Sequence, residues 1–399
     1  MTKDTHLQPQ PQLQVQPQHA VPCLFMRGGT SKGPFFKAED LPQDKGQRDK
    51  VLLSIMGSPD KRQIDGLGGA HPLTSKVGIV SKSDKAGVDL EFLFAQLQPD
   101  KDTVDTTPNC GNMLAAVVPF AIETGMFVPT SDTTTCRVLT LNTDMLSDIS
   151  VETPLLPKAS NASQGSRFVN YSGEARIDGA PGSSAPITIN FLDTAGSVCS
   201  SLLPTGRVKD RVRVVPTQDL SGFDPFDIDV TCIDNGMPLV IFKASDVGRT
   251  GSESVAELNS DTELKTKIEA LRLQVSLLMG LGDVKTKNYP KMTLVAPPVN
   301  GGSLTTRSFI PHVCHDAIGV LAAVTVGTAC VLKGSVCEGV AVIGEHDSVV
   351  VSVEHPTGEF SVELGLDPKN SQSVTRAALL RTARLIMKGE AMVPAHLLS

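Results

Sequence analysis

Two ten-residue stretches of the sequence are apolar at nearly every position, residues 113–122 (MLAAVVPFAI) and residues 317–326 (AIGVLAAVTV). A helix on a protein surface keeps one polar face, so these stretches predict helices that are enclosed by other structure. Both are far shorter than the ~20 apolar residues that a membrane span needs. Short β-type runs, such as residues 77–80 and 187–191, occupy much of the remaining chain between clusters of Gly, Pro, Asp and Asn. We therefore expect a sheet-rich chain built around two buried helices.

The two apolar stretches also predict two related halves. A cysteine precedes each of them, Cys110 in NCGN and Cys314 in PHVCH, and 399 residues are enough for two or three domains. We expect an α+β fold of two similar domains, each a curled sheet or barrel around a central helix, with the two cysteine-bearing helix starts facing one another. The expected parts are a disordered Gln/Pro-rich tail over 1–20, a first domain over 21–190 and a second over 191–399. Helices are expected at 47–56, 112–124, 260–279, 314–332 and 373–387.

Charge and cysteine usage exclude several classes of protein. Lys and Arg total 36 against 43 Asp and Glu, a formal net charge of −7, whereas proteins that bind nucleic acid usually carry a strongly basic face. The first twenty residues lack the basic-then-apolar order of a signal peptide, so a cytoplasmic protein is expected. The eight cysteines form no C-x-x-C pair, which favours reduced thiols. His312 and His315 have metal-ligand spacing without a third ligand pattern, so no metal is expected.

Cys110, in the segment DTTPNCGNM (105–113), is the first candidate for chemistry. A thiol in the first turn of a helix lies at the positive end of the helix dipole, beside backbone N–H groups that have no partner. That position favours the thiolate and lets an anionic ligand dock nearby. The alternative is that Cys110 is a small buried hydrophobic residue, which is the usual fate of a free cysteine.

Lys76 is the second candidate, at the end of the segment DGLGGAHPLTSK (65–76). Three glycines and a proline shape the loop, and Ser75 and Lys76 then lead into the apolar run 77–80. A lysine at the mouth of a buried strand loses hydration, which favours the neutral amine and makes it usable as a base. The alternative is an ordinary surface lysine at the end of a strand.

The segment MRGGTSKG (26–33) is the third candidate. It is not a nucleotide-binding P-loop, because that motif needs Gly before Lys and the order here is Lys32-Gly33. It predicts a cradle for a carboxylate, with charges on Arg27 and Lys32 and donors from the residues between them. Those donors are Gly28, Gly29, Thr30 and Ser31. A simple tight turn is the alternative.

Seven ordered motifs together resemble the PrpF-type isomerases, and most closely their 4-oxalomesaconate tautomerase-like branch. The match runs from about residue 21 to the C-terminus and leaves out the Gln/Pro-rich tail. The motifs are MRGGTSKG (26–33), DGLGGAHPLTSK (65–76), DTTPNCGNM (105–113), CIDNGMP (232–238), MGLGD (279–283), PHVCH (311–315) and RTARLIMKGE (381–390).

The resemblance implies a fold similar to that of diaminopimelate epimerase, with the active site in the cleft between two domains. It implies cofactor-independent isomerisation of an unsaturated di- or tricarboxylate such as 2-methylaconitate, 4-oxalomesaconate or aconitate. The catalytic lysine and cysteine of the family fall on Lys76 and Cys110. Cys314 has a weaker claim, because not all PrpF-like relatives keep a second thiol. A homodimer is one expectation for the assembly, and the carboxylate-binding candidates are the residues 27–32, Ser75, Asn109, Gly111, Asn112 and His315.

The resulting hypothesis is that Lys76 and Cys110 form an acid/base pair that moves a proton between two carbons. The sequence does not decide which of the two is the base. One alternative is a hydrolase in which Cys110 is the nucleophile and His71 or His315 is the base. A protein that binds a polycarboxylate without converting it, and an isomerase similar to those of phenazine biosynthesis, are the others.

Overall fold

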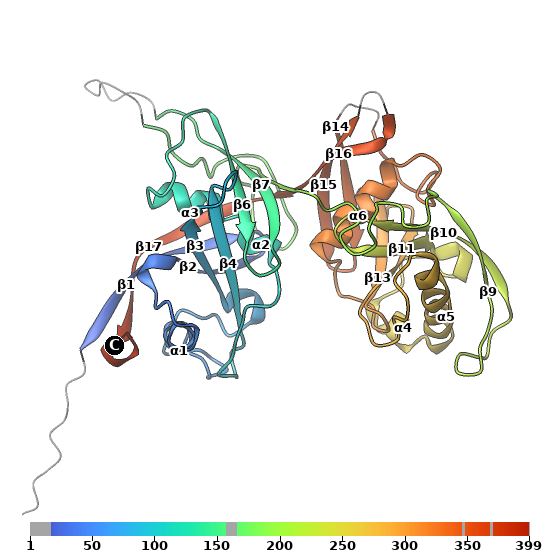
Figure 1. Cartoon of the computed structure of the whole chain (residues 1–399), viewed down its shortest axis with the longest axis horizontal. Coiled ribbons are helices and arrows are strands. Elements are labelled where there is room, and N and C mark those ends of the chain that lie inside the picture. The colour runs from blue at the N-terminus through green and yellow to red at the C-terminus, as the bar shows by residue number, and fades with distance from the viewer. Residues whose placement is uncertain (1–16, 157–165, 345–347, 368–369, 399) are drawn as a thin grey trace, which may run out of the picture.

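The computed structural model describes residues 17–156, 166–344, 348–367 and 370–398, which form two lobes joined by extended segments (Figure 1). The strands of both lobes belong to one continuous hydrogen-bonded network of seventeen strands. A disordered tail is predicted over residues 1–20, and residues 1–16 of it lie outside the described residues. Strand β1 begins at Gln18, three residues earlier than expected.

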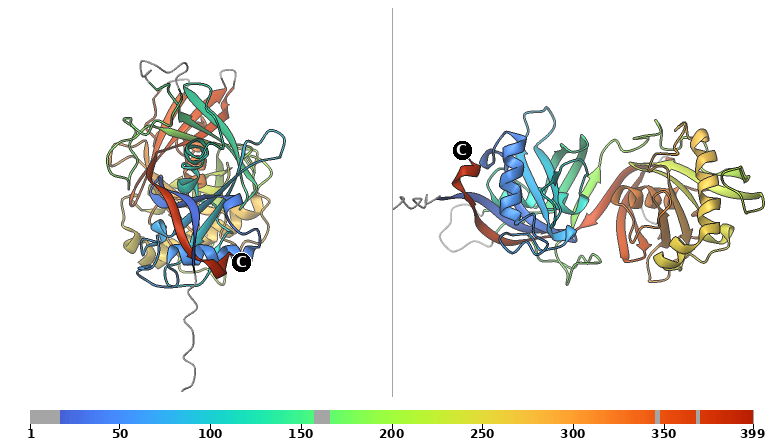
Figure 2. Two further views of the ribbon diagram at one scale, coloured as in Figure 1. Left: turned by 90° about the vertical axis from the view of Figure 1, so that its left-hand side faces the viewer. Right: turned by 90° about the horizontal axis from the view of Figure 1, so that it is seen from below.

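The first lobe is a curled sheet with two short helices inside it. In the left view of Figure 2, which faces the free end of this lobe, α3 is enclosed by strands. The strands are β1 (Gln18–Gly28), β2 (Ser31–Lys37), β3 (Lys76–Lys82), β4 (Leu90–Leu97), β5 (Val104–Asp105), β6 (Thr133–Thr140), β7 (Met145–Glu152), β8 (Ile187–Phe191) and β17 (Ala383–Pro394). The helices are α1 (Lys45–Met56), α2 (Gly111–Leu114) and α3 (Val117–Glu123), with 3₁₀ turns η1 (Ala38–Asp40) and η2 (Pro72–Thr74), and a last one, η4 (Ala395–Leu397), follows β17.

The second lobe is organised in the same way around α6. Its strands are β9 (Asp210–Val214), β10 (Phe226–Asp234), β11 (Pro238–Lys243), β12 (Lys291–Ala296), β13 (Leu304–Phe309), β14 (Ser348–His355), β15 (Gly358–Asp367) and β16 (Asn370–Arg381). Its helices are α4 (Val255–Ser260), α5 (Thr262–Leu278) and α6 (Val320–Val331), with η3 (Ala244–Val247). Nine consecutive residues of α6, from Ala322 to Cys330, are buried, whereas α5 lies on the outside of the lobe.

The pairing of the strands repeats from one lobe to the other. In the first lobe β1–β2, β3–β4, β6–β7 and β7–β8 are antiparallel, and β2–β3 and β4–β6 are parallel. In the second lobe β10–β11, β12–β13, β14–β15 and β15–β16 are antiparallel, and β11–β12 and β13–β14 are parallel. Each buried helix follows the fourth strand of this series, apart from the two-residue strand β5. The expected α+β fold of two similar domains is therefore confirmed.

The last strand returns to the first lobe. β17 pairs with β1 over the whole length of both strands, from Gln18 opposite Pro394 to Gly28 opposite Ala383. In the repeat, β9 holds the equivalent place beside β10. Residues 383–394, which the sequence assigned to the second domain, thus lie in the first lobe, and the division at residue 190 stays a prediction.

Both central helices are shorter than expected. The predicted helix 112–124 is split into α2 and α3, because Pro119 has no N–H to donate to the carbonyl of Ala115. The predicted helix 314–332 begins only at Val320, after the N-cap residue Gly319. Cys314 therefore does not stand at a helix start, which corrects the symmetric picture of two cysteine-bearing helices.

The prediction of a helix over residues 373–387 is wrong. The segment contains strong helix formers (VTRAALLRTARLIM), but it forms the end of β16, which pairs with β15 and β8, and the start of β17. Pairing with strands that are distant in the sequence has overridden the local propensity. Within the described parts of the chain, every helix falls short of the length and apolar character that a bilayer span requires.

Candidate active site

An amine and a thiol lie in contact inside the first lobe. Lys76 Nζ and Cys110 Sγ are 3.5 Å apart, and each residue is 8% exposed. Lys76 opens β3, where strand alternation places it on the face of Gly78 and Val80, toward α2 and α3. Its Nζ also lies 5.0 Å from the ring centre of Phe94 on β4. The structure thus brings together the two residues that the sequence singles out as catalytic candidates.

Cys110 is the N-cap residue of α2. Its N–H donates to Oδ1 of Asn109 at 3.0 Å, and Nδ2 of Asn109 donates to Oγ1 of Thr143 at 3.2 Å. Because α2 has only four residues, few peptide dipoles are aligned behind the thiol, and the electrostatic effect expected from a long helix is reduced. The main chemical feature of Cys110 is therefore its contact with Lys76.

The loop that leads to Lys76 is built around Gln63. Oε1 of Gln63 accepts from the N–H of Ala70 at 2.9 Å and from the hydroxyl of Ser75 at 2.7 Å. Ser75 Oγ also lies 2.9 Å from the carbonyl oxygen of His71. Ser75 is buried and stabilises the loop through these contacts, and its predicted contact with substrate stays a prediction.

The turn between β1 and β2 packs directly on the start of α2. A Cβ atom at Gly28 would lie 2.4 Å from the carbonyl oxygen of Asn112, and one at Gly29 would lie 2.1 Å from its Oδ1. Gly29 also has a φ of +53°, so glycine is required there for two reasons. Nδ2 of Asn112 donates to Oγ1 of Thr30 at 3.0 Å. Asn112 Oδ1 and Ser31 Oγ are buried without a hydrogen-bond partner among the described residues.

Arg27 and Lys32 face away from this packing. They lie opposite each other in the β1–β2 ladder, whereas Met26 and Gly28, which alternate with Arg27, face α2. Nη1 of Arg27 donates to the carbonyl of Gly29 at 2.7 Å and to Thr382 Oγ1 at 2.9 Å. Arg27 therefore stabilises the turn between β1 and β2. The predicted contact of Arg27 and Lys32 with a carboxylate stays a prediction, and the geometry separates both charges from the Lys76–Cys110 pair.

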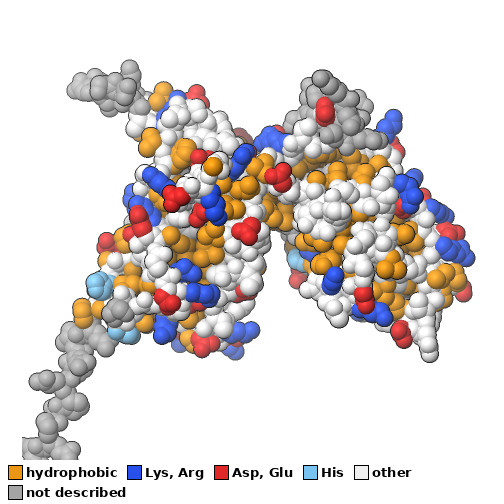
Figure 3. Space-filling view, in the orientation of Figure 1, with side chains coloured by type: hydrophobic (Ala, Val, Ile, Leu, Met, Phe, Trp, Pro, Cys, Tyr) orange, Lys and Arg blue, Asp and Glu red, His pale blue; other side chains and the backbone are white. Residues whose placement is uncertain are grey.

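The start of α6 in the second lobe lies against the start of α2 in the first lobe. A Cβ atom at Gly111 would lie 3.2 Å from a methyl of Val320, the first residue of α6, so the two central helices meet at their N-termini. Lys291 Nζ lies 3.4 Å from the Cβ position of Gly319, and burial lowers the pKa of Lys291. In Figure 1, α2 and α6 lie on the facing sides of the lobes, and Figure 3 shows a deep recess between the lobes below their junction.

His315 and Cys314 belong to the segment before α6. His315 is half-buried, its Nδ1 accepts from the N–H of Ala317 at 2.8 Å, and burial together with the charge of Lys291 lowers its pKa. Its predicted contact with substrate stays a prediction. Cys314 packs in the outer core of the second lobe beside α5, apart from the cluster that contains Cys110. Burial raises the pKa of Cys314 to about 11.

Arg381 is a buried arginine that the sequence motifs did not single out as a candidate. It is the last residue of β16, is 2% exposed, and its Cζ lies 4.2 Å from the ring centre of Phe360. Nη1 donates to the carbonyl of Leu380 at 2.7 Å, whereas Nε and Nη2 have no hydrogen-bond partner among the described residues. Burial lowers the pKa of Arg381 to about 9, and negative charge on Glu359 and Cys110 acts in the opposite direction. Arg381 is the first residue of the motif RTARLIMKGE, which could have indicated it. The helix expected over 373–387 did not predict that this arginine is buried.

Comparison with known proteins identifies the family of the chain. The family model described as PrpF protein matches residues 18–394. The chain belongs to the PrpF family. A (4E)-oxalomesaconate Delta-isomerase of Novosphingobium sp. (strain KA1) is 50% identical over 374 residues, which cover 94% of this chain and 98% of that protein. A 4-oxalomesaconate tautomerase of Pseudomonas putida is 46% identical over 372 residues, 93% of this chain and 96% of that protein.

The fold of this PrpF-family chain also matches a solved structure. The crystal structure of a methylitaconate-delta-isomerase has a TM-score of 0.79 and 33% sequence identity, covering 96% of this chain and 97% of that one. All three relatives are named isomerases or tautomerases, and this chain is an isomerase of the PrpF family.

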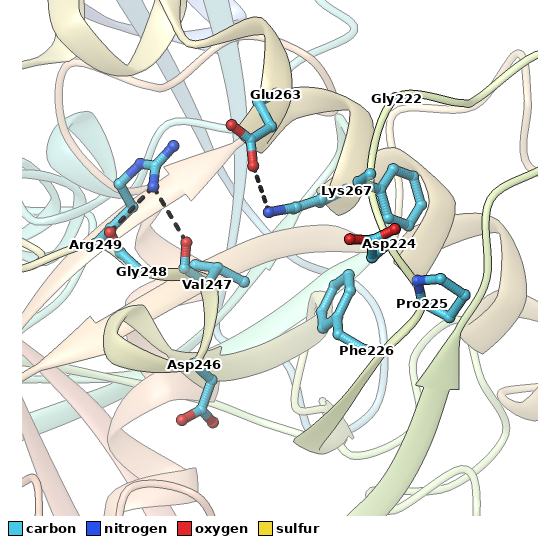
Figure 4. A pocket seen from close by; sticks show the side chains of 11 residues that line it. Gly222, Asp224, Pro225, Phe226, Asp246, Val247, Gly248, Arg249, Glu263 and Lys267 are labelled. Atoms are coloured by element: carbon cyan, nitrogen blue, oxygen red, sulfur yellow. Dashed lines mark hydrogen bonds and ion pairs between the residues drawn. The ribbon is translucent and has the colours of Figure 1, made fainter.

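One surface hollow of the PrpF-family chain lies apart from the Lys76–Cys110 pair. A hollow of about 870 Å³ on the second lobe is lined by Phe223, Phe226 and the ion pair of Lys267 with Glu263 (Figure 4). Lys267 pairs with Glu263, Arg249 pairs with Asp261, and Asp224 and Asp246 are exposed. The lining of the hollow contains neither Lys76 nor Cys110. Among the described residues, no three His, Cys, Asp or Glu side chains gather in a way that could hold a metal ion.

Proposed function

We propose that this PrpF-family isomerase moves a double bond, or inverts its geometry, in a small unsaturated di- or tricarboxylate, with Lys76 and Cys110 as the acid/base pair. The 3.5 Å contact between the buried Nζ and Sγ atoms carries the proposal. The relatives named for oxalomesaconate and methylitaconate support the substrate class. A cytoplasmic location and a homodimer stay predictions.

The proposed reaction needs only a proton shift. One group removes a proton from a carbon next to the double bond, and the electron pair spreads over the alkene and the adjacent carboxylate as a dienolate. A proton is then returned to the far allylic carbon, where a new C–H bond forms as the double bond moves. The substrate neither gains nor loses atoms or electrons, so the step requires no redox cofactor.

The contact between Lys76 and Cys110 lets the pair restore itself after each turnover. If one group takes the proton and the other returns one, a proton must pass between them before the next cycle. A separation of 3.5 Å between nitrogen and sulfur is within hydrogen-bond reach for this transfer.

A screen in D₂O tests the proposal. The protein is incubated with 4-oxalomesaconate, 2-methylaconitate, cis-aconitate, trans-aconitate and itaconate, and proton NMR follows isomerisation and deuterium incorporation. We expect one member of the panel to convert with deuterium at the allylic carbon, and 4-oxalomesaconate comes first because both relatives near 50% identity are named for it. Lys76→Ala and Cys110→Ala should each lose about 10² to 10⁴-fold in kcat. Near wild-type turnover in both variants would contradict the assignment of the pair.

The hydrolase alternative is less well supported by the geometry. Cys110 Sγ contacts Lys76 Nζ, whereas Nδ1 of His71 accepts from the N–H of Leu73 and Nδ1 of His315 accepts from that of Ala317. His71 is also exposed. A covalent acyl-enzyme, seen as a mass increase after incubation with substrate, would revive the alternative. A protein that only binds its ligand would be stabilised by it without any deuterium exchange.

A further inference from the structure

We propose that Arg381 is the carboxylate receptor of this active site, and that its open Nε/Nη2 edge takes one carboxylate of the substrate side-on. The inference rests on the proposed function for its substrate class. It adds a substrate-binding residue that lies on neither the 26–33 turn nor the segment around Cys110.

The hydrogen bonding of Arg381 is incomplete on one edge. The residue is 2% exposed, and Nη1 donates to the carbonyl of Leu380 at 2.7 Å. Nε and Nη2, which point along the same edge of the guanidinium, have none among the described residues. A buried guanidinium with two unused donors is unfavourable unless something pairs with it. Glu359, the carboxylate that acts most strongly on its charge, instead accepts from the hydroxyls of Ser352 and Ser361.

Two other arginines show what this edge does when a carboxylate is present. Nε and Nη2 of Arg137 donate to the two carboxylate oxygens of Asp148 at 2.8 and 2.9 Å. Nε and Nη2 of Arg272 donate to those of Glu269 at 2.7 and 2.8 Å. Arg272 is as deeply buried as Arg381, so burial alone does not leave this edge empty. Arg381 offers the same fork, and a substrate carboxylate fits it bidentately.

The position of Arg381 is close to the catalytic pair. On β16 it shares a face with Leu379, which packs in the same core cluster as Cys110 and α2. The carbonyl of Thr382, the next residue, accepts from the N–H of Gly29 at 2.8 Å, and Gly29 packs on Asn112, two residues after Cys110. Cys110 is one of the groups whose charge acts on Arg381.

Other buried polar atoms without a partner among the described residues lie on strands that neighbour the end of β16. Ser31 lies opposite Gly28 in the β1–β2 ladder, and Gly28 lies opposite Ala383, two residues after Arg381. Within the described part of the chain, Ser31 Oγ and Asn112 Oδ1 are buried without hydrogen-bond partners, as are the two Arg381 nitrogens. Ser31 would donate to the carboxylate that Arg381 holds. In the dienolate, negative charge spreads onto the substrate carboxylate. If Arg381 holds that carboxylate, its positive charge stabilises the dienolate.

The test uses propane-1,2,3-tricarboxylate, a saturated tricarboxylate that cannot isomerise, as a probe of binding. Its Kd is measured by calorimetry for the wild type, for Arg381→Met and for Arg376→Met. Arg376 is the matched control, because it lies on the same strand and pairs with a carboxylate of the protein, that of Glu363, at 3.0 Å. We expect Arg381→Met to weaken binding by about 10² to 10³-fold and to raise KM for the substrate, and Arg376→Met to stay near the wild type.

Thermal melting separates a receptor from a structural arginine. If Arg381 is a receptor, Arg381→Met without ligand melts at the wild-type temperature or above it, because an unpaired buried charge has been removed, and the shift caused by the probe is lost. If Arg381 is only structural, the variant melts lower and binds the probe as the wild type does. That second outcome, or probe binding within threefold of the wild type, overturns the proposal.

Two further measurements keep the inference independent of one variant and of the proposed function. Arg381→Lys retains the charge but lacks the fork, and we expect about tenfold weaker probe binding, whereas unchanged binding would contradict the bidentate contact. A crystal structure of the wild type with the probe supports the inference if a carboxylate lies on the Nε/Nη2 edge and overturns it if the probe binds elsewhere. If no substrate isomerises but probe binding still depends on Arg381, the proposed function fails and this inference stands.

Discussion

Glycine at position 29 illustrates how single residues hold the site together. Its backbone has a φ of +53°, and any side chain would collide with Asn112 at the start of α2. The motif MRGGTSKG predicts Gly28 and Gly29 as donors to a ligand. The structure shows in addition that they allow the β1–β2 turn to approach α2 closely, which helps to position Cys110.

Gly29→Ala should therefore destabilise the protein and reduce activity together. We expect a loss of about 2 to 3 kcal/mol in the free energy of unfolding, from the strained φ and from the collision with Asn112, and at least a tenfold fall in kcat/KM. Gly87→Ala is the control, because Gly87 also has a positive φ (+76°) but faces open space. Urea unfolding and steady-state kinetics measure both variants. Equal losses in the two would show that the close approach to Asn112 contributes little.

His355 gives a prediction about pH. Burial lowers its pKa to about 4, Asp178 acts in the opposite direction, and His315, Arg381 and Arg307 add to the decrease. A histidine that is neutral in the folded state takes up a proton more readily when unfolded, so stability is complete above pH 6.5 and falls as the pH drops toward 4. We expect His355→Gln to lose less stability than the wild type between pH 7 and pH 4.5, by about 2 kcal/mol. His19→Gln, at an exposed position of β1, is the control. Identical pH profiles for His355→Gln and the wild type would contradict the prediction.

At the scale of elements, buried carboxylates anchor loops to strand ends. Asp234 ends β10 and accepts from the N–H groups of Val198 and Cys199 at 2.7 and 2.8 Å and from the hydroxyl of Ser197 at 3.1 Å. These contacts hold the start of the long connection between β8 and β9. Asp234 is fully buried, so its charge depends on these donors.

Asp234→Ala should lower the free energy of unfolding by about 3 kcal/mol, because the buried N–H of Cys199, the N–H of Val198 and the hydroxyl of Ser197 lose their acceptor. Asp227→Ala on the same strand should cost at most about 0.5 kcal/mol, since Asp227 is 41% exposed and pairs with Arg213 at the surface. Chemical denaturation of both variants makes the comparison. A loss below 1 kcal/mol for Asp234→Ala would mean that the connection is held by other contacts.

At the scale of the whole molecule, the first lobe depends on the end of the chain. β17 supplies Ala383, Ala391 and Val393 to its core and covers the edge of β1. Arg381 lies two residues before the first residue of this strand. The crossing from β16 to β17 therefore links the completion of the first lobe to the placement of the proposed receptor.

Removing residues 383–399 should abolish the soluble folded protein. β1 would lose its antiparallel partner and expose an unpaired edge, which favours aggregation. Removing only residues 395–399, which follow β17, should leave a folded protein with a melting temperature within a few degrees of the wild type. Size-exclusion chromatography and thermal melting compare the two truncations. A folded monomer without β17 would contradict the account of the first lobe.

The sequence by itself determined much about this protein, because several features depend on local pattern. Runs of apolar residues predict the enclosed helices, and β-branched residues between turn formers predict the strands 77–80 and 187–191. Seven ordered motifs indicate the family. Lys76 and Cys110 stood out because unusual residue types lie beside glycine-rich turns and buried segments.

Only the tertiary structure decided the features that depend on pairing between distant segments. The strands over 373–387 exist because β15, β8 and β1 lie beside them, against the helical preference of their residues. The Lys76–Cys110 contact joins residues 34 positions apart, and Arg381 is buried where β16 lies beside β8 and the ring of Phe360 on β15. Local propensity contains no information about such partners, since the free energy that selects them comes from surfaces that meet only when the whole chain has folded.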